Sequence, residues 1–156
     1  MDLVQEAVAV VGVLAEDKKQ TLSVTGDQGA VVRADRAFLR MDLVNLLDNA
    51  VKYSPAGSTI RVSLHPVGAD SGPLEFVELA IQDEGPGIPE VAQQRVFDRF
   101  YRLDEARTSD SGGFGLGLPI AKWAVEAHGG NISVKTASPG GAVFYIKLPI
   151  ATGTQD

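Results

Sequence analysis

The chain has 156 residues, the size of one domain, and its 44% hydrophobic and 22% charged residues are typical of a folded, soluble chain. It contains no cysteine, which excludes a disulfide scaffold and a thiolate zinc site. Its two histidines, His65 and His128, are far apart in sequence, which argues against a histidine-rich metal site, and its longest apolar run, Ala7 to Ala15, is too short for a membrane helix. The net charge of −6 argues against nucleic-acid binding. The cluster of arginines from Arg95 to Arg107 alternates with acidic residues, which is typical of a solvated face.

The first half of the chain predicts two helices and two short strands. Apolar residues at helical spacing favour a helix over Asp2 to Asp17, after a start that lacks the basic segment of a secretory signal. Thr21 to Thr25 and Val31 to Ala34 are typical of short strands separated by a glycine-bearing turn. Asp35 is suited to cap a long helix that runs to Tyr53, where Ser-Pro-Ala-Gly ends it.

The next segments predict a strand pair, a long loop and two more helices. Thr59 to Pro66 and Leu74 to Gln82 favour strands joined by a polar loop. Pro89 to Val96 predicts a short helix, and the polar, glycine-rich run from Arg102 to Gly115 predicts a long loop. Leu116 to His128 predicts a helix with a proline in its first turn.

The chain ends in a predicted hairpin. Gly129-Gly130 is suited to cap the preceding helix, and Asn131 to Thr136 and Ala142 to Leu148 favour strands. The polar residues after Pro149 are expected to be a frayed tail. Since strands and helices mix without strict alternation, we expect an α+β fold with a helical layer on a largely antiparallel sheet.

The helix that ends at Tyr53 carries a polar face with unusual residues. Asn45 and Asn49 are poor helix formers, and their amide oxygens suit a hard cation such as Mg²⁺. Lys52, one turn on, would face the anion that the cation neutralises. Taken alone, the pattern also fits two incidental asparagines on a solvated face. At 100° per residue, Leu39, Leu43, Leu46, Leu47 and Ala50 fall on one arc and Asp42, Asn45, Asn49, Lys52 and Tyr53 on the opposite arc.

Two glycine-rich segments add further candidate binding groups. Asp83 follows a strand, where a carboxylate can accept a hydrogen bond from an exocyclic amine, and Gly85 and Gly87 allow a flat ring to approach; a plain polar turn is the alternative. Alternating glycines from Gly112 to Gly117 open the next helix, where free N–H groups favour an anion; a flexible hinge is the alternative. Together the three segments predict a Mg²⁺–ATP site.

The order of these segments resembles the catalytic, ATP-binding domain of bacterial sensor histidine kinases, in the superfamily shared with DNA gyrase, mismatch-repair ATPases and a heat-shock chaperone. The resemblance covers nearly the whole chain. The matching motifs are the N box Asn45 to Ser54, the first glycine box Asp83 to Gly87, the F box Val96 to Arg102, the second glycine box Gly113 to Leu118 and the run His128-Gly129-Gly130.

The resemblance implies roles for individual residues. Asn49 would ligate Mg²⁺ with Asn45 beside it, and Lys52 and Arg102 would act as catalytic residues that contact the phosphates. Asp83 would accept a hydrogen bond from the adenine amino group. The implied ATP-binding residues are Asn45, Asn49, Lys52, Tyr53, Asp83, Gly85, Gly87, Ile88, Arg102, Gly113, Gly115, Leu116, Gly117 and Leu118.

The resemblance also implies the architecture. The expected fold is a Bergerat-type two-layer α/β sandwich, with a mixed, mostly antiparallel sheet on about three helices and a mobile ATP lid over Arg102 to Gly112. Residues 1–18 would be a helix or linker from the end of a separate dimerisation domain, 19–150 the catalytic domain and 151–156 a disordered tail. The expected partners are that dimerisation domain and, indirectly, a response regulator. The expected location is the cytoplasm, with the parent kinase anchored in the inner membrane.

Two departures from the family pattern keep other functions open. Phe114 stands where a small or polar residue is usual, which favours a nucleotide-binding module without kinase activity as an alternative. Neither histidine has the context of a phosphoacceptor, so we expect the acceptor in a separate domain and a capping role for His128. A clamp ATPase or a serine kinase of the same superfamily is a further alternative, although Asn45 replaces the glutamate that serves as general base there.

Overall fold

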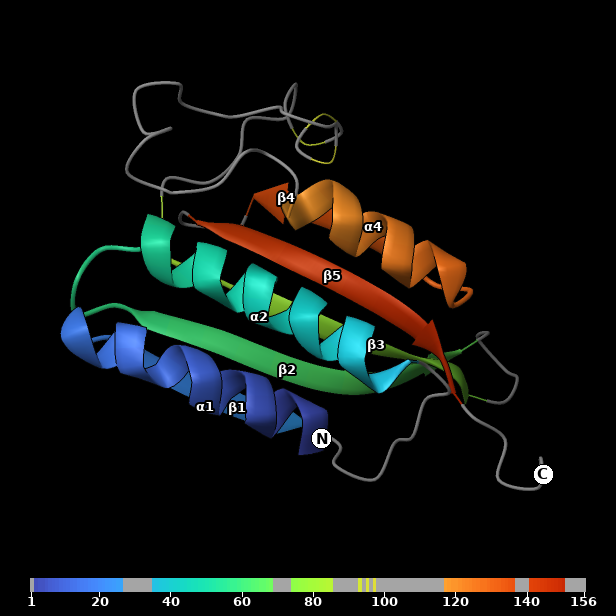
Figure 1. The fold of residues 1–156 in the computed structure, drawn as a ribbon, viewed down its shortest axis with the longest axis horizontal. Coiled ribbons are helices and arrows are strands. Elements are labelled where there is room, and N and C mark those ends of the chain that lie inside the picture. The colour runs from blue at the N-terminus through green and yellow to red at the C-terminus, as the bar shows by residue number, and fades with distance from the viewer. Residues whose placement is uncertain are drawn as a thin grey trace.

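The computed structural model describes residues 2–26, 35–68, 74–85, 93, 95, 97, 117–136 and 141–150, which form two layers (Figure 1). A five-stranded sheet forms one layer, and the described helices lie across one of its faces. This arrangement confirms the predicted α+β sandwich. The elements are α1 (Asp2–Asp17), β1 (Thr21–Gly26), α2 (Arg36–Tyr53), β2 (Thr59–Gly68), β3 (Leu74–Gln82), α4 (Gly117–Ala127), β4 (Asn131–Thr136) and β5 (Ala142–Pro149).

The sheet has the strand order β1-β2-β3-β5-β4 and is mostly antiparallel. Only β1 and β2 run parallel, with Thr21 opposite Thr59, and the other neighbouring strands are antiparallel. β3 lies in the centre, and its last residue, Gln82, pairs with Val143 of β5. The end of β3 and the start of β5 therefore lie side by side, although a long stretch of chain separates them.

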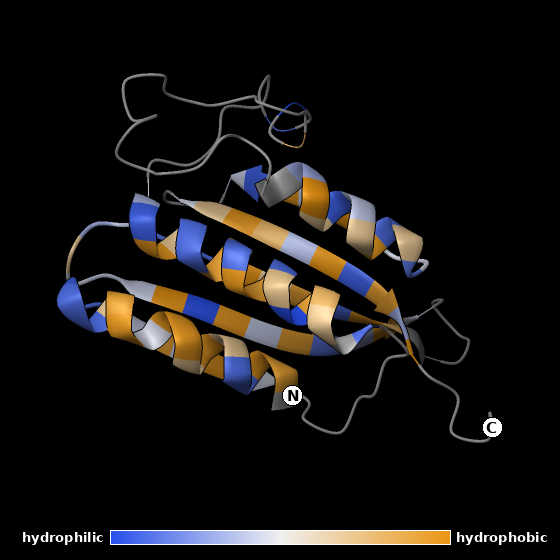
Figure 2. Ribbon diagram, in the orientation of Figure 1, coloured by the Kyte–Doolittle hydropathy of each residue, from blue (hydrophilic) through white to orange (hydrophobic). Residues whose placement is uncertain are grey.

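The core lies between the sheet and the helices. Along β2, Ile60, Val62 and Leu64 are buried while Arg61 and His65 are exposed. Figure 2 shows the corresponding alternation in hydropathy as bands on the strand. The helices contribute buried residues three and four positions apart, which is the spacing of one helical face. These residues are Val4, Ala7, Val11 and Ala15 of α1, Leu39, Leu43, Leu46, Leu47, Ala50 and Val51 of α2, and Ala121, Ala124 and Val125 of α4.

Helix α2 begins at the predicted cap, and that cap is tied to α4. The side chain of Asp35 accepts hydrogen bonds from the amides of Ala37 (3.0 Å) and Phe38 (3.2 Å). The ring of His128 joins the two helix ends, since Nδ1 lies 2.7 Å from the carbonyl oxygen of Ala124 and Nε2 accepts from the amide of Asp35 at 2.9 Å. The structural role expected for His128 is thus confirmed, with a second contact that the sequence did not indicate.

Several boundaries differ slightly from the expectation. β2 continues two residues past Pro66, to Gly68, with a register shift between Val67 and Gly68. α4 starts one residue later and ends one residue earlier than predicted. The predicted strand Val31 to Ala34, the helix Pro89 to Val96, the lid and the tail lie outside the described residues or have only isolated residues described.

One position on the polar arc of α2 was predicted wrongly. Asp42 is completely buried, at 0% exposure, whereas Asn45, Asn49 and Tyr53 are half-buried and Lys52 is exposed. The reason is geometric, because Asp42 lies one turn after Leu39 and one turn before Leu46 and so shares the stripe of these buried residues.

Helix α1 belongs to the same layer as α2 and lies beside it (Figure 1). Its buried residues form part of the common core with those of α2 and the sheet. The proposed domain boundary near residue 18 stays a prediction. Within the described ranges, no helix has the length and apolar character to cross a membrane.

Candidate functional site

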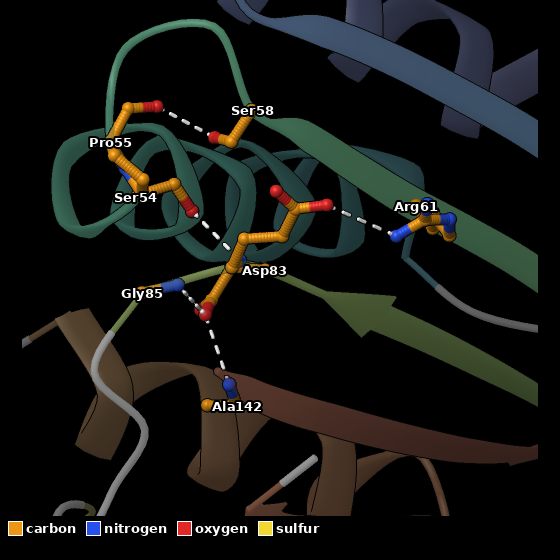
Figure 3. A network of polar contacts seen from close by, with 8 residues as sticks. Ser54, Pro55, Ser58, Arg61, Asp83, Gly85 and Ala142 are labelled. Atoms are coloured by element: carbon orange, nitrogen blue, oxygen red, sulfur yellow. Dashed lines mark hydrogen bonds and ion pairs between the residues drawn. The ribbon is translucent and has the colours of Figure 1, made fainter. Parts of the chain in front are cut away.

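Asp83 is held by the backbone at the point where β3 ends (Figure 3). Its Oδ1 accepts hydrogen bonds from the amides of Gly85 and Ala142, both at 2.9 Å. Its own amide donates to the carbonyl oxygen of Ala142, also at 2.9 Å. Two main-chain segments therefore fix the orientation of a carboxylate that is only 7% exposed.

The second oxygen of this carboxylate accepts no hydrogen bond from the residues that the structure describes. Both hydrogen bonds from described residues go to Oδ1, which leaves Oδ2 as an acceptor. Burial raises the pKa of Asp83, and the hydrogen bonds from the amides of Ala142 and Gly85 lower it again in part. A buried acceptor of fixed orientation is suited to read a single N–H group of a ligand.

Two glycines let the chain pack closely around Asp83. A Cβ atom on Gly85 would lie 2.5 Å from the carbonyl oxygen of Tyr53. Gly141 has a φ of +95°, and a Cβ there would overlap the carbonyl oxygen of Asp83. In the structure the missing side chain of Gly85 makes room for the last turn of α2; the expectation that it admits a flat ring stays a prediction.

Ser54 connects that last turn to the residue after Asp83. Its Oγ accepts a hydrogen bond from the amide of Glu84 at 3.2 Å, and the side chain is 2% exposed. Glu84 also pairs with Arg61 of β2, with Nη1 3.4 Å from Oε2 (Figure 3). The end of α2, the end of β3 and the start of β5 thus meet at one corner of the fold.

The polar residues of α2 lie in the turns that lead to this corner. Asn45 and Asn49 are four residues apart and so lie one turn above the other on the same stripe. Nζ of Lys52 is 3.1 Å from Oδ2 of Asp48. Oδ1 of Asp48 is buried and has no hydrogen-bond partner in the described part of the chain.

The structure therefore brings part of the predicted site together. Tyr53 at the end of α2 lies against Gly85, two residues after Asp83. Asn45, Asn49 and Lys52 lie further back along α2, and the backbone of Gly117 and Leu118 opens α4. The sequence did not indicate Ser54, Gly141 and Ala142 as supports of Asp83; the only signal was the glycine pair Gly140-Gly141, which lies between the two strands of the predicted hairpin. The predicted residues outside the described ranges are Gly87, Ile88, Arg102, Gly113, Gly115 and Leu116, and Phe114 lies there too.

Comparison with known proteins assigns the chain to a family. Residues 34–152 match the family described as histidine kinase-, DNA gyrase B- and HSP90-like ATPases. The sensor histidine kinase WalK of Bacillus subtilis is 39% identical over 130 residues, which cover 83% of this chain and 21% of WalK. The chain therefore belongs to this ATPase family. Within the family, it matches the catalytic, ATP-binding part of sensor histidine kinases.

Solved structures agree with this assignment. The mycobacterial sensor histidine kinase MprB superposes with a TM-score of 0.81 at 33% identity, covering 96% of this chain and 94% of that one. Full-length ShkA, solved in complex with AMPPNP, superposes with a TM-score of 0.77 at 29% identity, covering 97% of this chain and 30% of that one. The chain spans 21% and 37% of the lengths of WalK and of SenX3 from Mycolicibacterium smegmatis, two curated relatives that it matches.

Proposed function

We propose that this domain binds Mg²⁺–ATP and transfers the γ-phosphoryl group to a histidine on a separate helical dimerisation domain, from which a response regulator would receive it. The observation that carries the proposal is Asp83, whose carboxylate is held by two amides through one oxygen and offers the other. This oxygen would accept the N–H of the adenine amino group. The AMPPNP complex of ShkA supports a nucleotide as the ligand.

The polar face of α2 fits the phosphate end of the nucleotide. Asn45 and Asn49 offer amide oxygens, and Asp48 adds a buried oxygen without a hydrogen bond from the described residues. This oxygen-only donor set suits Mg²⁺, which Asn49 would hold with Asn45 beside it. When bound, the ion would supply charge neutralisation at the phosphates. Lys52 would add a positive charge there, after exchanging its partner Asp48 for a phosphate oxygen.

The residues present favour transfer to an imidazole over hydrolysis. An imidazole is already nucleophilic, so transfer to it depends on positioning and charge stabilisation more than on a general base. Asn45 cannot take a proton from water or from a serine hydroxyl, which disfavours the clamp ATPase and the serine kinase. Neither histidine of the chain is a suitable acceptor, because both ring nitrogens of His128 are hydrogen-bonded and His65 lies in β2 before Pro66.

The test uses γ-labelled ATP and Mg²⁺ with this chain alone and with the purified phosphoacceptor domain of the same kinase. We expect acid-labile label on the added domain, none on His65 or His128, and slow ATP turnover by the chain alone. Lys52→Ala should weaken the transfer. Label on either histidine of the chain alone would overturn the proposal. Measured ATP binding without label on the added domain would favour a binding-only module and make Phe114 the first residue to change.

The place of the domain in the cell follows from the same proposal. We infer that it acts in the cytoplasm, where ATP and response regulators are found, as part of a parent kinase anchored in the inner membrane. Fractionation of cells that produce the full-length parent tests this inference, and we expect the protein in the membrane fraction with this domain accessible to protease only from the cytoplasmic side.

A further inference from the structure

Two residues between α1 and β1 donate hydrogen bonds to the end of α2. Nζ of Lys18 donates to the carbonyl oxygens of Val51 (2.7 Å) and Ser54 (2.8 Å). Nε2 of Gln20 lies 3.1 Å from each of the same two oxygens. Both side chains therefore converge on one pair of main-chain acceptors, more than thirty residues away in sequence.

These contacts replace the usual end of a helix. The last carbonyl groups of a helix have no partner within it, and many helices satisfy them with a residue in left-handed conformation. Ser54, which follows α2, is instead extended, with φ −92° and ψ 147°. Lys18 and Gln20 supply the missing donors, and the ammonium group of Lys18 also lies at the negative end of the helix dipole.

The burial of the Gln20 side chain carries an energetic cost. Its side chain is 8% exposed, and its Oε1 is buried without a hydrogen-bond partner among the described residues. An unpaired buried acceptor is unfavourable, so an apolar side chain of similar size would suit the core better if packing alone mattered. The amide donors of Gln20, directed at α2, are what an apolar residue could not provide.

The turn at the end of α2 that accepts these hydrogen bonds also supports the candidate site. It also carries the carbonyl oxygen of Tyr53, against which Gly85 packs, and the Oγ of Ser54, which accepts from the amide of Glu84. Any shift of this turn would displace Tyr53 and Lys52 relative to Asp83.

We propose that Lys18 and Gln20 are positioning residues for the nucleotide: they set its affinity by fixing the last turn of α2 against the end of β3. This inference rests on the proposed function, since it takes the corner around Asp83 as the nucleotide site. Neither residue contacts the nucleotide, and each acts through the carbonyl groups of Val51 and Ser54.

The test compares the affinity for Mg²⁺–ADP in matched variants of this chain. Lys18→Met keeps the stem and removes the donors, Gln20→Leu removes the amide, and Lys18→Arg restores donors. We expect Lys18→Met and Gln20→Leu each to raise the Kd by about tenfold, because a turn that is no longer fixed must be ordered when the nucleotide binds. Lys18→Arg should recover most of the affinity.

Two controls separate positioning from general stability. Lys19→Met changes the neighbouring exposed lysine, and Val4→Ala lowers stability in the core of α1. Titrations are made at 10 °C, where circular dichroism verifies that each variant is folded, and both controls should keep the wild-type Kd. The amide resonance of Glu84 should shift in Lys18→Met and Gln20→Leu but not in Val4→Ala.

The outcomes distinguish this inference from the function on which it rests. A wild-type chain that fails to bind Mg²⁺–ADP would overturn the proposed function. A wild-type chain that binds, with folded Lys18→Met or Gln20→Leu variants of unchanged Kd, would overturn the positioning role alone. If Lys18→Met does not fold, Gln20→Leu decides by the same criterion. An equal rise in Kd for Val4→Ala would assign the effect to stability and also overturn it.

Discussion

Two aspartates are buried among the residues that the structure describes, and their surroundings differ. Asp83 is 7% exposed and receives two amide hydrogen bonds on one oxygen. Asp42 is 0% exposed, lies within α2, and neither of its oxygens has a hydrogen-bond partner among the described residues. Burial raises the pKa of both, for Asp42 to about 7, although attraction to His128 lowers that value in part.

The comparison shows that burial alone does not mark a binding group. At Asp83 the main chain compensates part of the lost hydration and orients the carboxylate, as a site that recognises a ligand requires. At Asp42 no hydrogen bond from the described residues compensates the loss, and the attraction to His128 offsets only part of it, so the side chain lowers the stability of the fold whenever it is ionised. The same residue type is thus oriented as a recognition group would be in one place and weakens the core in the other.

The largest effect is expected from breaking the support of Asp83. Gly141→Ala introduces a side chain at φ +95° that would overlap the carbonyl oxygen of Asp83. We expect a loss of about 4 kcal/mol or more in the free energy of unfolding, from backbone strain and overpacking together. Urea unfolding measures it. Gly12→Ala, where a Cβ has open space within α1, is the control and should be neutral or slightly stabilising; equal stability of both variants would contradict the packing described.

Removing the other buried carboxylate should have the opposite sign. Because the pKa of Asp42 is raised from 3.8 to about 7 on folding, the folded chain binds more protons than the unfolded one between these values, so stability falls as pH rises through this window. Asp42→Leu should add up to about 4 kcal/mol at pH 8, and the gain should shrink towards pH 4.

The measurement for Asp42 is urea unfolding as a function of pH. Asp17→Asn removes the same charge from an exposed position of α1 and should leave the pH profile near that of the wild type. A gain for Asp42→Leu that is as large at pH 4 as at pH 8 would show that better packing, not the charge, causes it.

The third prediction concerns recognition alone. Asp83→Asn can keep Oδ1 as the acceptor for Gly85 and Ala142 while it turns the second oxygen into a donor. The affinity for Mg²⁺–ADP should fall by about 1–3 kcal/mol with little change in melting temperature. Asp42→Leu should leave the affinity unchanged within about twofold, since a group without a binding role contributes nothing to it. Equal affinity of Asp83→Asn and the wild type, measured by calorimetric titration, would mean that Asp83 does not read the base.

The smallest expected effect is at the link between α2 and the turn after Asp83. Ser54→Ala removes the acceptor of the Glu84 amide and should cost about 1 kcal/mol of stability. Ser133→Ala, at an exposed position of β4, serves as the control in the same urea titrations. If the two serine variants are equally stable, the hydrogen bond of Ser54 is energetically neutral.

The fold was predictable because the local signals agree with the tertiary structure. The Asp35 cap, the apolar spacing of α1 and the alternation along β2 all specify their elements independently of the rest of the chain. The prediction from sequence was wrong or incomplete where a residue lies at the edge of a helical face or where the contact is made by the backbone. Asp42 lies at the edge of two stripes, so only the packing of α2 decides whether it is buried.

The residues that support the candidate site could not be predicted from the sequence for a different reason. Lys18, Gln20 and Ser54 act on or through main-chain groups, which every residue carries and which no side-chain pattern reveals. Gly141 supports Asp83 from the position just before β5, which follows much later in the chain. The position of Asp83 directly after a strand was predictable, because a carboxylate after a strand and before glycines is a local pattern; its role in binding stays a prediction.

The pairing of Asp83 with Ala142 also has a consequence for how the chain folds. The two residues are 59 positions apart, so their hydrogen bonds require the closure of a long loop, whereas β2–β3 and β4–β5 are antiparallel pairs of strands consecutive in the described chain. We expect those pairs to form in the transition state and this corner to close after it, because contacts between distant segments carry the larger entropic cost. Substitutions here, such as Ser54→Ala, should then accelerate unfolding and leave the refolding rate nearly unchanged in stopped-flow experiments. The site that recognises the ligand would be the last part of the sheet to assemble and the first to open.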